Sequence, residues 1–492
     1  RGDSTALEPL INTLLATYSA PEILNDILLK AMQQVGVLFN EGKLLLPFVL
    51  KSAEVMRACS TLLESHLKGE TNADKGVVVL ATVKGDVHDI GKNLVDIILT
   101  GNGYKVINMG TKVSGEEIAK AAIEHKADAI GMSGLLVKSV EIMKENIALF
   151  ASQGLKTKIL LGGAALSEDY VMKECAPLMP ELVYYCKDAF AGVSAMNGSA
   201  TISIWRADPA AANPFAGKHW AVQPYKRSIA AKFYGNSEVE RVTIANILPF
   251  LHKKALFETR WGARSAAEIQ EAEARLEQML AQLATIVKPQ LVYGFYPVSV
   301  RGNELWLPNE ITHKQVDGKI VFAGSKAWSC FASFPKGANG ECFADLYRVA
   351  EDEHGHFSYI AYQAVLPLQA VSLGSEVVDY LNSHYKQNHY EQYYQYHGLL
   401  AELTDALAAY TQERVASLLF SEESWCEGVP QSIEKTWRYS FGYPLCPDLE
   451  GNKAICNLLE AERIGITLTE NAQMEPIYST CAMLSWHPAS RY

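Results

Sequence analysis

The sequence predicts a multidomain protein with a helical bundle first, a doubly wound α/β domain second and an α+β domain third. Two observations lead to this fold class. Apolar residues recur at helical spacing over residues 1–70 and then give way to apolar runs that alternate with helical stretches. Beyond residue 236, strand-like and helical stretches are mixed along the chain. The 492 residues, 49% of them hydrophobic, are enough for several domains.

Residues 1–70 have the pattern of a small antiparallel helical bundle. Apolar side chains lie three and four residues apart through Ile23, Ile27 and Met32, and the pattern returns around Val49. The short segments SAPE and NEGK interrupt it and separate the helices. We therefore expect the first domain to span these residues.

Residues 71–200 contain five apolar runs, GVVVLATV, YKVINMG, ADAIGMSGLL, KILLGGA and LVYYC, which alternate with helical stretches. Strands that are apolar along their whole length are typical of a parallel sheet with helices on both faces. This segment is therefore predicted to be a flavodoxin-like, Rossmann-type α/β domain. Residues 201–235 are rich in Pro, Gly and Asn and are predicted to be a linker. Residues 236–492 form the predicted α+β domain.

Composition narrows the functional classes. The net charge of −11 argues against a nucleic-acid or anionic-membrane surface, because such surfaces need clustered Lys and Arg. No apolar run reaches the roughly 18 residues of a membrane-spanning helix. Nine cysteines without a C-x-x-C pair favour reduced thiols in a cytoplasmic protein. The chain lacks an initiator Met and stops inside a structured pattern, so we expect a fragment of a longer protein.

The segment DVHDIG follows the first apolar run and places Asp86 two residues before His88. Ligands of doubly wound sheets bind beyond the carboxyl ends of the strands, which is where this segment lies. If the segment is extended, both side chains share one face, and the carboxylate can fix the imidazole tautomer so that the other nitrogen becomes a better metal ligand. Gly91 leaves room for a large planar group. The alternative is an ordinary polar loop in which Asp89 caps the next helix.

Further motifs follow at the ends of later strands. Ser133-Gly134-Leu135 begins after 41 residues beyond Gly91, and Gly162-Gly163 begins after 26 residues beyond Leu135. This series resembles the fingerprint of cobalamin-binding domains that take the cofactor with its own base displaced by a protein His. The resemblance implies that His88 is the axial metal ligand of cobalt, and that the displaced nucleotide tail enters a channel lined by the Ser and Gly residues.

The same resemblance implies a full set of site residues. Asp86, His88 and Ser139 would form a ligand triad in which proton uptake favours release of His88 from cobalt. The wider cobalamin site would comprise Gly85, Asp86, Val87, His88, Asp89, Gly91, Ser133, Leu135, Val137, Ser139, Gly162, Gly163 and Ala189.

The helical bundle carries the segment VGVLFNEGKLLLPFVLKSAEVM, which resembles the cap of the cobalamin-dependent methionine synthase family. In that family a Phe and a Leu, seven residues apart, cover the upper face of the corrin ring. The matching residues are Phe39 and Leu46. Periodicity alone would make both of them ordinary core residues.

The last domain resembles the activation domain of the same family, which binds S-adenosylmethionine. Its marker R-x-x-x-G-Y is present from Arg438 to Tyr443, and the later H-P-x-x-x-Y ends at Tyr492. The resemblance implies that Arg438 binds the carboxylate of the ligand, while the backbone around Ser440 and Gly442 approaches the adenine side.

Two positions depart from the family pattern: a Glu of the family's cap aligns with Asn25, and the second departure lies in the last domain. The acidic residue expected to hold the ammonium of S-adenosylmethionine falls at Asn246 in the segment ANILPF. A carboxamide accepts hydrogen bonds but carries no charge. Asp405 is therefore a candidate to contribute in its place.

The expected function is that of the C-terminal part of a cobalamin-dependent methyltransferase of this family. Cobalamin would carry a methyl group between methyltetrahydrofolate and homocysteine, and S-adenosylmethionine would reactivate it after oxidation. Expected partners are the homocysteine module, with its zinc, and the folate module of a longer chain, together with a flavodoxin-like electron donor. We expect a monomer that binds neither nucleic acid nor membranes, and a rigid-body rearrangement with residues 197–235 as the tether.

Three alternatives stay open. A corrinoid carrier of another methyltransferase system would have the same cap and fingerprint but would end near residue 200. A cobalamin-sensing regulator would add a basic DNA-binding helix-turn-helix. An adenosylcobalamin mutase would lack the cap and add a barrel. The long third segment disfavours the first, and neither a helix-turn-helix nor a barrel is visible in the sequence.

Overall fold

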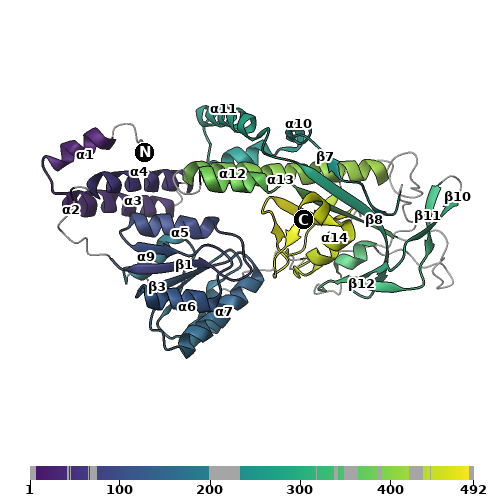
Figure 1. Cartoon of the computed structure of the whole chain (residues 1–492), viewed down its shortest axis with the longest axis horizontal. Coiled ribbons are helices and arrows are strands. Elements are labelled where there is room, and N and C mark those ends of the chain that lie inside the picture. Colours follow the sequence, from purple (N-terminus) through teal and green to yellow (C-terminus); the bar gives the residue numbers. More distant parts are fainter. Residues whose placement is uncertain are drawn as a thin grey trace. The chain divides into compact units, whose positions relative to one another are not determined.

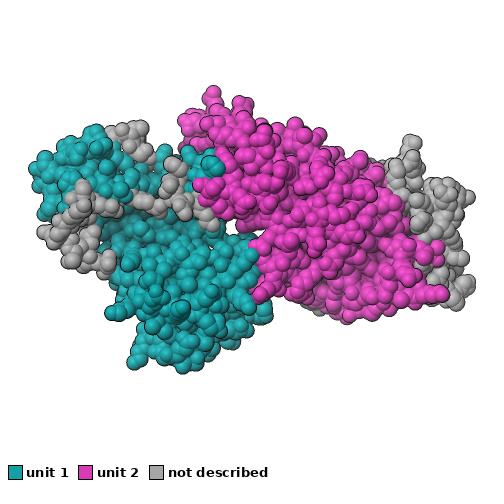
Figure 2. Space-filling model, viewed as in Figure 1, with its two compact units in different colours: residues 1–207, 261–264, 384–395 teal, residues 208–260, 265–383, 396–492 magenta. Residues whose placement is uncertain are grey.

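The structure is a computed structural model of the chain. It describes residues 7–40, 44, 46–64, 66, 75–198, 233–316, 319–336, 342–347, 364–385, 390–419, 436–443 and 445–486. The chain divides into two compact units, coloured separately in Figure 2. Unit 1 comprises Arg1–Ala207, Trp261–Arg264 and His384–Gln395, and unit 2 comprises Asp208–Arg260, Ser265–Ser383 and Tyr396–Tyr492.

Unit 1 begins with helices, drawn in purple in Figure 1: α1 (Leu7–Leu15), α2 (Ala20–Glu22), α3 (Leu29–Asn40) and α4 (Leu46–Glu64). A capping box between Ser19 and Glu22 starts α2, and a π-helical stretch, Ile23–Leu28, joins α2 to α3. The helices share a small core that includes Ile23 and Leu63, both fully buried. The predicted helical pattern is therefore realised by packing of the apolar stripes against one another.

A five-stranded parallel sheet follows, with the strand order β2-β1-β3-β4-β5. Its strands are β1 (Val77–Thr82), β2 (Lys105–Asn108), β3 (Ala129–Ser133), β4 (Lys158–Gly162) and β5 (Val183–Tyr185). This is the flavodoxin-like order, and the order reverses between β1 and β3. The carboxyl ends of these two strands therefore form the crevice where ligands of this fold bind.

Helices cover both faces of the sheet (Figure 1): α5 (Ile90–Gly101), α6 (Gly115–Glu124), α7 (Val137–Ser152), the single turn α8 (Glu168–Tyr170) and α9 (Ala189–Met196). Val78 and Leu160 pack with α5 and α9, whereas Val79 and Leu161 pack with α6 and α7. Successive strand residues point to opposite faces. Burial of both faces explains why the strands are apolar along their whole length.

Unit 2 is built on an eight-stranded sheet with the order β12-β9-β8-β13-β17-β14, to which β6 and β7 add beside β8. Two separate hairpins complete its strands. The bounds are β6 (Gly235–Asn236), β7 (Glu240–Arg241), β8 (Gln290–Arg301), β9 (Glu304–Pro308), β10 (Thr312–Val316), β11 (Lys319–Gly324), β12 (Trp328–Ser333), β13 (Ala364–Ser372), β14 (Trp437–Tyr439), β15 (Thr467–Leu468), β16 (Met474–Glu475) and β17 (Ser479–Ser485). The pairings within the large sheet are antiparallel.

Unit 2 contains the helices α10 (Ile244–Ile247), α11 (Ala266–Leu283) and α14 (Gly451–Leu459) and most of α12 (Glu376–His384) and α13 (Tyr390–Leu419). The last residue of α12, His384, and residues Tyr390–Gln395 of α13 belong to unit 1. A core of its own, which includes Leu368, Leu459 and Met483, lies under the sheet. Within the described part of the chain, no helix has the length and apolar character needed to cross a membrane.

The predicted fold class is confirmed: a helical bundle, a parallel flavodoxin-like domain and an α+β domain succeed one another along the chain. Helix ends differ from the sequence pattern. The amphipathic pattern that starts at Ala266 predicts a helix to Val287, but α11 ends at Leu283. The Tyr-rich stretch from His389 to Tyr410 predicts a second helix, and α13 continues beyond it to Leu419. Helix ends depend on local capping and tertiary contacts, which a periodic pattern does not report.

Candidate functional site

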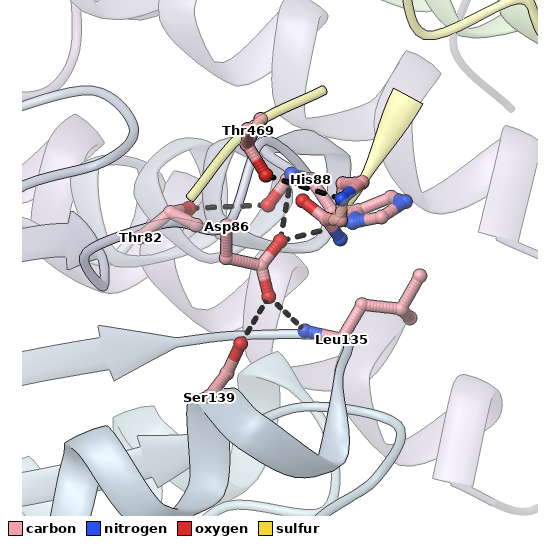
Figure 3. A network of polar contacts seen from close by, with 7 residues as sticks. Thr82, Asp86, His88, Leu135, Ser139 and Thr469 are labelled. Atoms are coloured by element: carbon pink, nitrogen blue, oxygen red, sulfur yellow. Dashed lines mark hydrogen bonds and ion pairs between the residues drawn. The ribbon is translucent and has the colours of Figure 1, made fainter. Parts of the chain in front are cut away.

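The Asp86 carboxylate is the centre of a polar network at the crevice of unit 1 (Figure 3). Asp86 and His88 lie in the loop between β1 and α5, Leu135 follows β3, and Ser139 lies in the first turns of α7. All these positions are at the carboxyl ends of β1 and β3, where the strand order reverses. The topology thus brings Ser139 to Asp86 across 53 residues of sequence.

Four donors surround this carboxylate. Its Oδ1 accepts hydrogen bonds from the backbone amide of His88 at 3.0 Å and, on the other side, contacts His88 Nδ1 at 2.9 Å. Its Oδ2 accepts from the amide of Leu135 and from Ser139 Oγ, each at 2.6 Å. The Asp86 side chain is completely buried. A buried carboxylate is tolerated only when it is bonded in this way.

These contacts decide the charge of Asp86. Burial by itself raises the pKa of the carboxyl, because it removes the charged form from water. The hydrogen bonds from the side chains of His88 and Ser139, followed by those from the amides of His88 and Leu135, outweigh burial and lower the pKa from 3.8 to about 2. Asp86 is therefore a carboxylate at neutral pH.

The ionised carboxylate in turn orients the imidazole of His88. A carboxylate can only accept, so Nδ1 carries the hydrogen in this contact, and any metal would be bound through Nε2. Thr82 Oγ1 donates to the backbone carbonyl of His88 at 3.1 Å and holds the loop from the β1 side. The His88 side chain is 35% exposed. The arrangement is that of a carboxylate that fixes a metal-binding His.

A cavity of about 380 Å³ lies beside this network, between the sheet and helices α5 and α9. Six of the residues predicted for the cobalamin site line it: Phe39, Gly91, Ser133, Gly162, Gly163 and Ala189. Most of the remaining lining is apolar, with Leu80, Leu94 and Phe190 among the contributors. Such a lining suits a flat, weakly polar group.

Glycines shape the crevice in different ways. A Cβ at Gly134 would lie 2.5 Å from Ser139 Cβ and 3.1 Å from Asp86 Oδ2, so this position has no room for a side chain. A Cβ at Gly91 would meet nothing within 4 Å. The fold therefore requires glycine at 134, whereas the open space at Gly91 is available for a ligand. Gly134 and Thr82 were not among the predicted site residues. For Gly134, the signal was its place inside the S-G-L motif.

Other predicted residues occupy the rim. Leu135 and Val137 are exposed apolar side chains, at 42% and 67% of their full accessibility, and Val87 is half-buried. Gly85 has a φ of 75°, which a turn at this point requires. Asp89 occupies the first position before α5, but its side chain makes no capping hydrogen bond.

Of the two predicted cap residues, Phe39 and Leu46, the structure describes the side chain of Phe39. Phe39, near the end of α3, packs against Phe190 with ring centroids 5.8 Å apart and lines the cavity. Leu46 begins α4, and its side chain lies outside the described residues. The structure therefore places Phe39 at the cavity, on the side of α9.

The second group of predicted residues lies in unit 2. Arg438 of β14 donates to the Asp405 carboxylate at 2.5 Å and to the Asp405 carbonyl at 3.2 Å. Ser440 Oγ donates to the carbonyl of Cys481, and Gly442 takes a positive φ of 94°. Tyr443 follows with 63% of its side chain exposed. Tyr492 lies outside the described residues.

Asn246 has a role within its own helix. Its Oδ1 accepts from the amide of Thr243 at 2.9 Å and from Thr243 Oγ1 at 2.7 Å, which closes a capping box at the start of α10. This position in a capping box usually holds Glu or Gln, and the carboxamide of Asn246 accepts the corresponding hydrogen bond from the backbone amide.

Comparison with known protein families assigns each of the three domains of the chain to a family. The family described as "B12 binding domain" matches residues 76–192, and a second family with the same description matches residues 1–64. The flavodoxin-like domain and the helical bundle are thus those of a vitamin B12-binding protein. Residues 247–492, half of the chain, match the family "Vitamin B12 dependent methionine synthase, activation domain". The chain belongs to this family, as the sequence predicted.

Two curated relatives agree with this assignment. The chain is 34% identical over 552 residues to a methionine synthase of Mycobacterium tuberculosis and 34% identical over 557 residues to one of Mycobacterium leprae. Each alignment covers 100% of this chain and 45% of the relative, so the chain spans about half the length of the curated relatives it matches. A solved structure of the MetH reactivation domain bound to AdoHcy covers 56% of this chain and 84% of its own, at 21% identity and a TM-score of 0.42.

The family match beyond residue 247 also bears on the alternatives. A corrinoid carrier that ends near residue 200 would have no activation domain, whereas this chain has one.

Proposed function

We propose that unit 1 binds cobalamin with His88 as the lower axial ligand of cobalt, and that unit 2 binds S-adenosylmethionine for its reactivation. The observation that supports the first part is the buried Asp86 carboxylate, which holds His88 Nδ1 at the switch point of the sheet. A His oriented in this way by a carboxylate is a common metal ligand.

The residues present fit the cofactor. His88 offers a nitrogen donor on a half-exposed side chain. The open space at Gly91 and the glycine-lined cavity leave room for the corrin edge and the displaced nucleotide tail. When bound, cobalamin supplies a cobalt centre that takes up and gives away a methyl group. The proposed site is completed by Gly85, Val87, Asp89, Leu135 and Val137, by Ala189 of the cavity wall, and by the cap residues Phe39 and Leu46.

The protein's own contribution is control of a proton. Because the pKa of Asp86 is lowered to about 2, Asp86 stays a carboxylate near neutral pH and keeps its contact with Nδ1 of His88. Protonation of His88 at Nε2 is incompatible with ligation through that atom. Asp86 and Ser139 would therefore set how readily His88 leaves the metal.

In unit 2, we propose that the carboxylate of S-adenosylmethionine binds to Arg438 in place of the Asp405 side chain. A guanidinium favours two-point contact with a carboxylate. Asp405, released from Arg438, would then be available for the ammonium group of the ligand. Ser440, Gly442, Tyr443 and Tyr492 are proposed to contact the remainder. Asn246 is a weaker candidate, because its carboxamide oxygen already closes the start of α10.

The wider activity is also a proposal. The methyl group would pass between methyltetrahydrofolate and homocysteine on partner modules of a longer, monomeric cytoplasmic chain, and a flavodoxin-like protein would supply the reactivating electron. We propose the domain limits 1–70, 71–200 and 236–492, with 201–235 as linker. Family membership supports this reading.

The test is the EPR spectrum of the chain reconstituted with cob(II)alamin. We expect splitting by one axial nitrogen in the wild-type protein and its loss in His88→Ala. His125→Ala, which removes an exposed His at the end of α6, is the matched control and should keep the splitting. ¹⁵N-labelled histidine should change the splitting in the wild-type protein, and a pattern that this label leaves unchanged would show that His88 is not the ligand.

A further inference from the structure

We infer that Gly163 is a positioning residue for the Asp86 and His88 network, acting through a single peptide unit. Gly163 was predicted only as part of the cavity wall. The structure shows that it also touches the backbone that holds Asp86. The proposal rests on the proposed function only in its consequence for cobalt ligation; its geometric part concerns the chain alone.

The contact is between Gly163 and the carbonyl oxygen of Gly134. A Cβ at position 163 would lie 1.9 Å from that oxygen and 3.0 Å from the carbonyl carbon, far inside any real contact. Gly163 also has a φ of 153°, a conformation that disfavours other residues. The Gly134 carbonyl therefore rests directly on the backbone of Gly163.

The same peptide unit reaches Asp86 from its other side. The carbonyl of Gly134 and the amide of Leu135 belong to one planar group, in which the oxygen and the hydrogen point in opposite directions. The oxygen contacts Gly163, and the amide donates to Asp86 Oδ2 at 2.6 Å. If a larger residue at position 163 pushes the Gly134 carbonyl, the Leu135 amide moves with it, because both belong to one planar peptide. The hydrogen bond to Asp86 then changes directly.

The sheet explains why these residues meet. Strands β3 and β4 are parallel neighbours, and Ser133 pairs with Gly162 in their register. Gly134 and Gly163 are the next residue on each strand end. Gly163 also lines the cavity of about 380 Å³. The peptide between Gly134 and Leu135 therefore connects the cavity wall at Gly163 to Asp86, the carboxylate that holds His88.

Gly162 provides the matched control. It lines the same cavity and ends the same strand, but a Cβ there would lie 3.4 Å from its nearest neighbour, the carbonyl of Cys186, which is an ordinary contact. Gly162→Ala and Gly163→Ala each add one methyl group at the end of β4. Only Gly163→Ala displaces the peptide of Gly134.

The first test uses the full chain without cofactor. In spectra of ¹⁵N-leucine-labelled protein, the Leu135 amide is assigned through its loss in Leu135→Ile. We expect this amide proton to lie far downfield, as a short bond to a carboxylate requires, and to move upfield in Gly163→Ala and in Asp86→Asn but not in Gly162→Ala. A Leu135 signal that is unchanged in Gly163→Ala overturns the inference.

A reciprocal measurement does not depend on whether Gly163→Ala folds. In ¹⁵N-glycine-labelled protein, Asp86→Asn should move the Gly163 amide and leave the Gly162 amide in place. Equal shifts at both glycines, or none at Gly163, contradict a link through the peptide.

The consequence is measured with cob(II)alamin by EPR. Loss of one hydrogen bond to a charged group predicts about a tenfold fall in the ratio of His88-ligated to unligated cofactor for Gly163→Ala. Gly162→Ala lies in the proposed binding site but leaves the Gly134 peptide in place, so its fall in this ratio should be smaller than that of Gly163→Ala. In an Asp86→Asn background, Gly163→Ala should have little further effect. Equal ligation ratios in the two glycine variants overturn the consequence. If the wild-type chain shows no nitrogen ligation, the proposed function fails, and the cofactor-free spectra still decide the inference.

Discussion

Asp86 remains charged in a place where a charge is costly. Its two oxygens accept from four donors, one of which is the hydroxyl of Ser139 at 2.6 Å. A carboxyl whose pKa is lowered in the folded state stabilises that state above the unfolded pKa near 3.8, and this contribution is lost as the pH falls through about 4 to about 2. The network is therefore a source of stability at neutral pH as well as a holder of His88.

Ser139→Ala removes one of these donors and should raise the pKa of Asp86 toward 3.8. We expect a loss of about 1–2 kcal/mol in the free energy of unfolding near pH 7, and the difference from wild type should shrink between pH 4 and pH 2. Urea unfolding at several pH values measures this. Ser152→Ala, which removes an exposed hydroxyl from the same helix, should be nearly neutral. A loss that does not vary with pH would mean that Ser139 acts through packing and not through Asp86.

Asn246 combines a local role with a predicted one. Its carboxamide oxygen closes the start of α10 with Thr243, and its contact with S-adenosylmethionine, suggested by its sequence position, stays a prediction. Residue types that cap helices overlap with those that bind ligands, and only the three-dimensional contacts separate the two roles.

At the scale of elements, helices α3 and α9 approach closely at Gly36. A Cβ on Gly36 would lie 2.7 Å from two ring atoms of Phe190, whose ring also contacts Phe39. The glycine allows the bundle helix to lie against the ring. Neither helical periodicity nor the motif series indicated this approach, because the two residues are far apart in the chain.

Gly36→Ala tests this packing. Alanine raises helix propensity by about 1 kcal/mol, yet the overpacking against Phe190 should cost about 1–3 kcal/mol, so the variant should be less stable than wild type. Gly192→Ala in α9 is the contrasting control, because its Cβ would enter open space and should stabilise by about 0.5–1 kcal/mol. Calorimetry of the unit 1 transition measures both. A Gly36→Ala protein as stable as wild type would contradict close contact of α3 with Phe190.

At the scale of the whole molecule, each unit has a hydrophobic core of its own. The core of unit 2 contains residues from its large sheet and from α14, whereas the cores of unit 1 lie on the two faces of the parallel sheet and within the bundle. Separate cores allow separate cooperative unfolding.

We therefore expect two calorimetric transitions with different ligand responses. A ligand at 100 times its Kd stabilises its own unit by about 2.7 kcal/mol, so cobalamin should raise one transition and S-adenosylmethionine the other. Arg438→Ala should abolish the response to S-adenosylmethionine, whereas Arg301→Ala, which removes an exposed Arg stacked on Trp306, should keep it. A single transition, or one raised by both ligands, would contradict independent units.

The sequence pattern alone was sufficient for the fold class and for placing Asp86 beside His88, and the resemblance to the cobalamin-binding family added Ser139 to them. Apolar strands buried on both faces leave a local pattern, and motif spacing in a parallel sheet repeats with each strand and helix. Only the tertiary structure decided which backbone groups complete the site. The amide of Leu135 and the close approach of Gly163 to Gly134 join strand ends that are distant in the chain, and any residue has an amide and a carbonyl, so residue identity carries no sign of such contacts.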